Sequence, residues 1–156
     1  MHIAQHRGPR ADLRWLFELA EDSAAALDAY IDAGDVLVAV DDGAIVGHLQ
    51  LVDGARPDEA EIKNMAVDPV RQRGGVGRAL VASAIRYARE RSRSALTVAT
   101  AAADIGNLRF YQRLGFRLRS VDRDAFTPAT GYPDGLRIDG IELRDRVWLD
   151  LRIEPG

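Results

Sequence analysis

The sequence contains no cysteine and only three histidines, and these shortages exclude several kinds of site at the outset. Without cysteine there is no disulfide, no thiolate-ligated metal and no cysteine nucleophile. The histidines, His2, His6 and His48, do not have the spacing of metal ligands. We therefore expect neither a metal cofactor nor a cysteine-based mechanism.

Long apolar runs are also missing. No stretch of about 18 apolar residues occurs, which argues against a transmembrane helix. The first seven residues, MHIAQHR, lack the apolar core of a secretory signal. With 47% hydrophobic and 29% charged residues in 156, the composition is that of a globular protein. We expect a single cytoplasmic domain over residues 1–156, with no membrane partner.

Charge is unevenly distributed along the chain, although the net charge is only −3. Residues 12–35 carry seven acidic side chains and one arginine, whereas residues 71–93 carry seven arginines and one glutamate. One explanation is that the two segments bind ligands of opposite charge. The alternative is that both are helix faces exposed to solvent. The pI of 5.6 and the scarcity of aromatic residues in the basic segment argue against nucleic-acid binding.

The hydrophobic pattern changes between helix and strand periods along the chain. Glu21-Asp22-Ser23 predicts a break between two helices, and Asp41-Asp42-Gly43 between two β-branched runs predicts a hairpin. A long connection, rich in Asp, Gly and Pro, is expected at 122–140. Strands are expected at 1–7, 36–40, 44–52, 60–67, 95–100, 116–121 and 141–153, and helices at 10–33, 76–91 and 104–114.

Three glycines in four residues, Gly74, Gly75 and Gly77, lie at the start of the helix expected at 76–91. Glycine lets backbone N–H groups face one concavity, which together with the positive end of a helix makes a phosphate site. Arg78 after Gly77 excludes a Walker A motif, and Leu80 excludes the dinucleotide fingerprint. The turn does fit the pattern [Q/R]-x-x-G-x-[G/A]. The alternative is a turn that only begins a helix.

Two blocks in a fixed order carry a family resemblance. EIKNMAVDPVRQRGGVGRAL joins a strand to the glycine turn and helix, and FYQRLGF joins a helix to a strand about 30 residues later. With the Asp-Gly hairpin, they make residues 35–120 resemble bacterial members of the GNAT superfamily of N-acetyltransferases. The resemblance implies the GNAT fold, an α/β architecture with a mixed central sheet of about six to seven strands flanked by about four helices. It also implies acetyl-coenzyme A as co-substrate.

The resemblance further implies which residues bind acetyl-coenzyme A. The glycine turn would hold the pyrophosphate through backbone N–H groups, and the preceding strand would pair with the pantetheine arm. Relatives often place an asparagine seven residues before the family tyrosine, where this chain has Asp104; Asn107 either makes that contact from a shifted position or only caps or solvates its helix. The implied cofactor-binding residues are Met65, Ala66, Val67, Gln72, Arg73, Gly74, Gly75, Val76, Gly77, Arg78 and Asn107.

The implied reaction is the attack of an amine on a thioester. An alkylammonium has a pKa of about 10.4 and a thiol one of about 8.5, so a base and an acid are both useful. Tyr111 matches the family tyrosine near the thioester sulfur and is the candidate acid; alternatively its ring only packs on the sheet. Glu61 matches the general-base glutamate of similar protein acetyltransferases, acting directly or through water; alternatively it is an ordinary strand residue. Without a cysteine to acylate, direct transfer in a ternary complex is expected.

No motif identifies the acceptor. In similar proteins the acceptor enters beside the first helices and the late loop, and here residues 12–35 and 122–145 are rich in acids. We therefore expect a cationic small-molecule amine. The alternatives are a protein or peptide lysine or N-terminal amine, a non-catalytic acetyl-coenzyme A sensor, and a phosphate-ligand binder outside this family. The oligomeric state is left open, a homodimer included.

Overall fold

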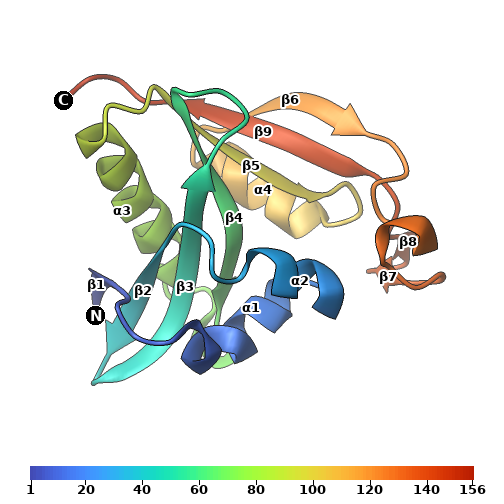
Figure 1. The fold of residues 1–156 in the computed structure, drawn as a ribbon, viewed down its shortest axis with the longest axis horizontal. Helices are drawn as coiled ribbons and strands as arrows, with labels where there is room; N and C mark the ends of the chain where they lie inside the picture. Colours follow the sequence, from blue (N-terminus) through green and yellow to red (C-terminus); the bar gives the residue numbers. More distant parts are fainter.

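A seven-stranded sheet, with strand order β1-β2-β3-β4-β5-β9-β6, organises the computed structural model, which describes residues 1–156 (Figure 1). The strands are β1 (His2–Gln5), β2 (Asp35–Asp41), β3 (Ala44–Asp53), β4 (Glu59–Val67), β5 (Ala95–Ala101), β6 (Arg117–Asp122) and β9 (Arg146–Arg152). A separate antiparallel pair consists of β7 (Arg137–Ile138) and β8 (Ile141–Glu142).

The four α-helices are α1 (Arg14–Ala20), α2 (Ala24–Tyr30), α3 (Val76–Glu90) and α4 (Ile105–Arg113). Short 3₁₀ turns are η1 (Arg10–Leu13), η2 (Pro69–Arg71) and η3 (Pro128–Thr130). The expected mixed sheet flanked by about four helices is thereby confirmed. None of the helices combines the length and the apolar character that a membrane span requires.

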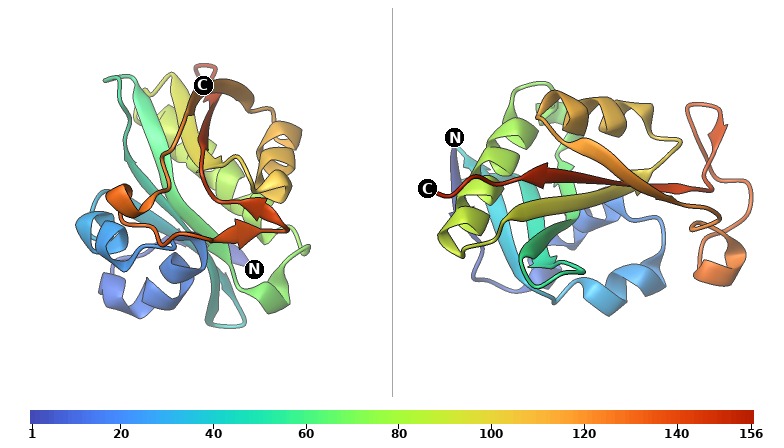
Figure 2. Two further views of the ribbon diagram at one scale, coloured as in Figure 1. Left: turned by 90° about the vertical axis from the view of Figure 1, so that its right-hand side faces the viewer. Right: turned by 90° about the horizontal axis from the view of Figure 1, so that it is seen from above.

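The helices form two layers, with α1 and α2 on one face of the sheet and α3 and α4 on the other (Figure 2). Each layer has its own apolar core. Leu80 of α3 and Tyr111 of α4 pack with Leu149 of β9 in the larger cluster. Phe17 of α1 and Leu27 of α2 pack with Val36 of β2 in the smaller one. The two faces of the sheet therefore present different surroundings to any molecule that enters it.

The only parallel pairing in the sheet, between β4 and β5, is short. Glu59–Ile62 pair with Ala95–Val98, and the two strands do not pair beyond that point. On its other edge, β4 shifts register against β3: Leu51 pairs with Ile62 but Gln50 with Asn64, so Lys63 is an extra, bulged residue. A bulge bends a strand and increases its twist. We attribute the split between β4 and β5 to this bulge.

Most element boundaries agree with the sequence predictions, and one strand prediction is wrong. The Asp-Gly hairpin joins β2 to β3, and Ser23 caps α2 by accepting the Ala26 N–H at 3.1 Å, which explains the break between the helices. The single strand expected at 141–153 is instead β8 and β9, separated by 143–145. Two contacts turn the chain there: Leu143 N–H bonds to the Leu136 carbonyl, and Asp145 accepts the Asp124 N–H.

His48 belongs to the core beneath α1. It is fully buried, its ring lies 4.3 Å from that of Phe17, and Nε2 is 2.8 Å from Asn64 Oδ1. Burial lowers the pKa of His48 to about 4, although the Asn64 hydrogen bond opposes the shift. A neutral imidazole donates to the Asn64 oxygen, while Nδ1 has no partner. His48 is therefore a structural histidine.

We predict that His48 makes stability fall between neutral and mildly acidic pH. In the unfolded chain the imidazole takes a proton below about pH 6.5, whereas in the folded protein it does so only near pH 4. The unfolded state therefore gains protons first, and stability is lost as pH falls through this window, by up to about 3 kcal/mol. Urea unfolding from pH 7 to 4 measures this loss. His48→Gln should reduce the dependence of the free energy of unfolding on pH, whereas His2→Gln, at an exposed position, should keep it. Equal pH dependence in the wild type and both variants would contradict the prediction.

Candidate active site

The glycine turn leads into α3 without a side-chain cap. Gly75 is the N-cap residue, with a φ of 83° that favours glycine. The first backbone bond of the helix is Ala79 N–H to Gly75 O. The N–H groups of Val76, Gly77 and Arg78 are consequently free to face an anion at the positive end of the helix. This local geometry suits a phosphate group.

The other glycines of the turn have different roles. A Cβ on Gly77 would lie 3.2 Å from the Phe110 ring, so this glycine lets α3 begin close to α4. A Cβ on Gly74 would meet only one backbone oxygen, at 3.3 Å. Gln72 donates from Nε2 to the Val67 carbonyl at 3.3 Å and holds the turn against the end of β4. The exposed side chains of Arg73 and Arg78 add positive charge around the turn.

The split half of β4 contains Met65, Ala66 and Val67. These residues pair with β3 on one edge, opposite Leu49, His48 and Gly47. On the other edge β5 no longer pairs with them. An extended molecule can add to such a free strand edge through main-chain hydrogen bonds. The predicted pantetheine contacts therefore lie at the opening of the sheet, beside the turn.

Tyr111 approaches the sheet from α4. The residue is 4% exposed and packs edge-on between Phe110 and Phe116, at centroid distances of 5.1 and 5.4 Å. Burial raises the pKa of Tyr111, and the charge of Asp104 adds to the effect. The hydroxyl therefore keeps its proton at neutral pH and can act as a donor.

Glu61 lies on the last paired stretch of β4, opposite Thr97 of β5. Its neighbour Ile62 packs into the core beneath α3 and α4, so Glu61 faces the α1 and α2 layer. Burial raises the pKa of the Glu61 carboxyl, and the charges of Lys63 and Arg146 partly oppose this. The Lys63 ammonium is 4.0 Å away, too far for a direct hydrogen bond. Glu61 and Tyr111 thus flank the sheet from opposite faces.

Asn107 and Asp104 lie at the start of α4. The Asp104 side chain caps the helix by accepting the Asn107 N–H at 2.9 Å, which is a common role for an acid at this position. The Asn107 side chain is exposed and donates to Thr100 Oγ1 on β5 at 3.3 Å. Asn107 is therefore near the β5 side of the opening, where its predicted contact with pantetheine stays a prediction.

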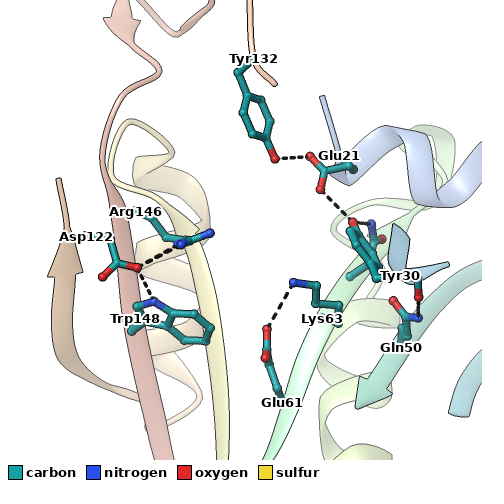
Figure 3. A network of polar contacts seen from close by, with 10 residues as sticks. Glu21, Tyr30, Gln50, Glu61, Lys63, Asp122, Tyr132, Arg146 and Trp148 are labelled. Atoms are coloured by element: carbon teal, nitrogen blue, oxygen red, sulfur yellow. Dashed lines mark hydrogen bonds and ion pairs between the residues drawn. The ribbon is translucent and has the colours of Figure 1, made fainter. Parts of the chain in front are cut away.

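On the α1 and α2 face, the structure brings together a polar cluster that no sequence motif predicts (Figure 3). Tyr30 donates to Glu21 Oε1 at 3.0 Å, and Tyr132 donates to Glu21 Oε2 at 2.7 Å. Across the open middle of Figure 3, Arg146 and Trp148 of β9 both donate to Asp122 Oδ2, at 3.1 and 2.8 Å. The polar cluster consists of Glu21, Tyr30, Glu61, Lys63, Asp122, Tyr132, Arg146 and Trp148.

The acids of residues 12–35 do not gather at this cluster. Glu18 and Asp28 pair with Arg14, each at 2.9 Å, and Asp35 accepts a hydrogen bond from Tyr87. Only Glu21 of the seven joins the polar cluster. No group of His, Asp and Glu side chains has the arrangement of a metal site.

Comparison with known proteins identifies the family. The family model described as "Acetyltransferase (GNAT) family" matches residues 6–116. The chain is 33% identical to the uncharacterized N-acetyltransferase YvbK of Bacillus subtilis over 138 residues, which is 87% of each protein. A crystal structure of a Bacillus subtilis acetyltransferase in complex with CoA superposes with a TM-score of 0.89 at 30% identity, covering 98% of this chain and 99% of that one.

A GNAT family acetyltransferase from Elizabethkingia anophelis with acetyl-CoA bound gives a TM-score of 0.85 at 28% identity, over 97% of each chain. The sequence blocks, the split sheet and the uncapped glycine turn are thus found in a protein that matches this family along most of its length. The chain belongs to the GNAT family of acetyltransferases, and it is an acyltransferase that uses acetyl-coenzyme A.

Proposed function

We propose that this acetyltransferase moves the acetyl group from acetyl-coenzyme A directly to the primary amine of a cationic small molecule, with both substrates bound at once. The carrying observation is that the pairing between β4 and β5 ends after Ile62, with Glu61 on the face of the α1 and α2 layer and Tyr111 packed in the opposite layer. An opening through the sheet lets donor and acceptor meet from different sides. The absence of cysteine fits direct transfer.

Binding of the donor would use the turn and the split strand. The free amides of Val76, Gly77 and Arg78 would hold the pyrophosphate, with Arg73 contributing charge. Met65–Val67 would pair with the pantetheine arm, and Asn107 would contact it from the β5 side. Bound acetyl-coenzyme A supplies an activated acetyl thioester at the opening.

The chemistry would divide between the two faces. An acceptor amine arrives as ammonium, and the ionised Glu61 carboxylate takes one proton from it, directly or through a water molecule. The freed nitrogen lone pair forms the new bond to the acetyl carbon as the bond from that carbon to sulfur breaks. The Tyr111 hydroxyl donates a proton to the departing sulfur, and the second proton that the nitrogen must lose to become an amide returns to the Tyr111 oxygen, directly or through water. The products are the amide, the coenzyme A thiol and a protonated Glu61. The pKa of Tyr111, raised by burial, favours its protonated form.

The charge of the polar cluster favours a cationic acceptor. Three carboxylates, from Glu21, Glu61 and Asp122, face two cations, Lys63 and Arg146, so the cluster is one charge negative. The rings of Tyr30, Tyr132 and Trp148 belong to the same polar cluster. Negative charge beside aromatic rings attracts cations. This local excess supports the proposal better than the acids of residues 12–35 do.

Gly74→Glu tests the donor site. A carboxylate at the turn should repel the pyrophosphate and weaken acetyl-coenzyme A binding about tenfold or more. Gly74 is the suitable glycine because Gly75 needs a positive φ and Gly77 needs the space beside Phe110. Calorimetric titration gives the affinity, and circular dichroism shows whether the fold is kept. Gly74→Gln is the control matched for size without the charge; equal affinity of a folded Gly74→Glu protein would contradict the assignment.

Glu61→Gln and Tyr111→Phe test the catalytic pair in one pH series. Each should lower kcat by about 10²–10⁴-fold, the usual contribution of a general base or acid. In the wild type, kcat/KM should rise with pH around the pKa of Glu61, which lies above the usual value for glutamate, because the protonated carboxyl accepts no proton. Glu61→Gln should remove this rise with pH, and Tyr111→Phe should keep it. If the kcat of Tyr111→Phe is within a factor of about two of the wild-type kcat, the Tyr111 ring has a packing role alone.

Thermal unfolding adds a readout for Glu61 that does not depend on turnover. Because burial raises its pKa, the ionised carboxylate destabilises the folded state above the pKa of the unfolded chain, about 4.3. Glu61→Gln should therefore raise the Tm at pH 7, and this gain should vanish below about pH 4.

A panel of amines tests the acceptor class. Release of the coenzyme A thiol is followed with cationic, neutral and anionic primary amines and with a lysine peptide. We expect the highest kcat/KM for a cationic small molecule, falling as salt shortens the Debye length from about 10 Å at 0.1 M. A best acceptor that is neutral or anionic, or a flat salt dependence, would refute this class. Turnover of the peptide alone would favour a protein acetyltransferase, and binding without turnover a sensor.

A further inference from the structure

Glu21 is held in place by hydrogen bonds at both carboxylate oxygens. Oε1 accepts from the Tyr30 hydroxyl, and Oε2 accepts from the Tyr132 hydroxyl and, at 3.3 Å, from the Ser23 N–H. The two tyrosines come from segments far apart in the chain, α2 and the connection after η3. The carboxylate is therefore fixed in one position at the edge of the polar cluster.

Glu21 is also the one carboxylate of the polar cluster without a cationic partner. Asp122 has Arg146 at 3.1 Å, and Glu61 has Lys63 at 4.0 Å. Lys63 itself lies 4.8 Å from the centre of the Tyr30 ring. The two cations of the cluster are thus assigned to the other two carboxylates. Hydroxyl and backbone N–H donors orient the Glu21 carboxylate, and no cationic side chain pairs with it.

Aromatic side chains surround this charge. Tyr30 and Tyr132 contact it directly, and Phe126 packs edge-on against Tyr132 at a centroid distance of 5.0 Å. A Cβ on Gly131 would lie 3.3 Å from Ser23 Oγ, so the connection before Tyr132 rests on the start of α2. Carboxylate and ring faces together form a common environment for an alkylammonium group.

Tyr30 links Glu21 to the proposed base. The Tyr30 hydroxyl donates to Glu21 Oε1. Burial raises the pKa of this hydroxyl, the hydrogen bond from Asn64 opposes the rise, and the charges of Glu21 and Glu61 add to it. Figure 3 shows Tyr30 between Glu21 above and the Glu61–Lys63 pair below. The carboxylate held by the tyrosines and the proposed base therefore lie on the same face of the sheet, on either side of Tyr30.

We propose that Glu21 is a specificity-determining residue that binds a second, distal ammonium of the acceptor while the reacting amine lies at Glu61. The acceptor class is then a diamine or a longer polyamine, with the two charges at opposite ends of an alkyl chain. This inference rests on the proposed function and adds to it the requirement for a second positive charge. Tyr30 and Tyr132 act as positioning residues for the carboxylate.

Three acceptors of matched length test the inference: an α,ω-diaminoalkane, the corresponding monoaminoalkane and the corresponding ω-amino acid, each over a series of chain lengths. Wild type should have the highest kcat/KM for one diamine. Glu21→Gln keeps the size of the side chain and removes its charge, so the ratio of kcat/KM for diamine to that for monoamine should fall about tenfold, equivalent to about 1.4 kcal/mol. The fall should appear mainly in KM.

Two control variants separate charge from structure. Asp22→Asn removes one negative charge next to Glu21 in the chain, and the ratio should stay at its wild-type value if the effect is local. Tyr132→Phe removes one hydrogen bond and leaves the Glu21 charge, so the preference for the diamine should persist. A loss of rate that is equal for all three acceptors in Glu21→Gln and Tyr132→Phe would overturn the inference and leave Glu21 as a structural contact.

Binding of the diamine to the protein–coenzyme A complex, measured by calorimetry, is independent of turnover. Binding that weakens about tenfold in Glu21→Gln supports the inference, even if no amine is acetylated and the proposed transfer fails. Acetylation of diamine, monoamine and amino acid with equal kcat/KM in wild type leaves the transfer standing and overturns the role of Glu21. Diamine binding that is absent or equal in both proteins overturns it as well.

Discussion

The bulge at Lys63 is the constraint on which the candidate active site depends. One extra residue in β4 ends the pairing with β5, so the sheet opens beside an otherwise continuous β3–β4 ladder. The same residue interrupts the alternation of side chains. Lys63 and Asn64 consequently both contact groups of the α1 and α2 layer, whereas Met65 returns to the core of the opposite layer. A single irregularity thus creates the opening and determines which side chains border it.

The two substrates would meet different electrostatic surroundings on either side of this opening. Unpaired amides at the start of α3 and nearby arginines suit a polyphosphate, while three carboxylates and two cations border the acceptor face. Most of the arginine-rich helix surface and most acids of α1 and α2 face solvent or form surface pairs, where they contribute little to stability.

The sequence predicted the features that depend on local signals. Alternating apolar residues, the Asp-Gly turn and the Ser23 cap indicate elements that the structure contains, and the two family blocks lead to the correct family. The bulge could not be predicted, because EIKNMAV has no glycine or proline to mark it. Tyr132 and Glu21 are 111 residues apart and belong to no motif, so only the folded chain brings them together. The error at 141–153 has the same origin, since tertiary contacts of Leu143 and Asp145 interrupt an apparently continuous strand.

The position of β9 has a consequence for how the protein is made. This strand is the last of the sheet to leave the ribosome, yet it lies between β5 and β6, with hydrogen-bonded neighbours on both edges. Until it arrives, β6 has no strand to pair with and β5 has a bare edge. Residues Met65 to Arg78, the proposed donor segment, are contiguous in sequence and can pair and turn early, whereas Arg146 and Trp148 arrive only with β9. A nascent chain can therefore form the glycine turn before the polar cluster has its β9 residues.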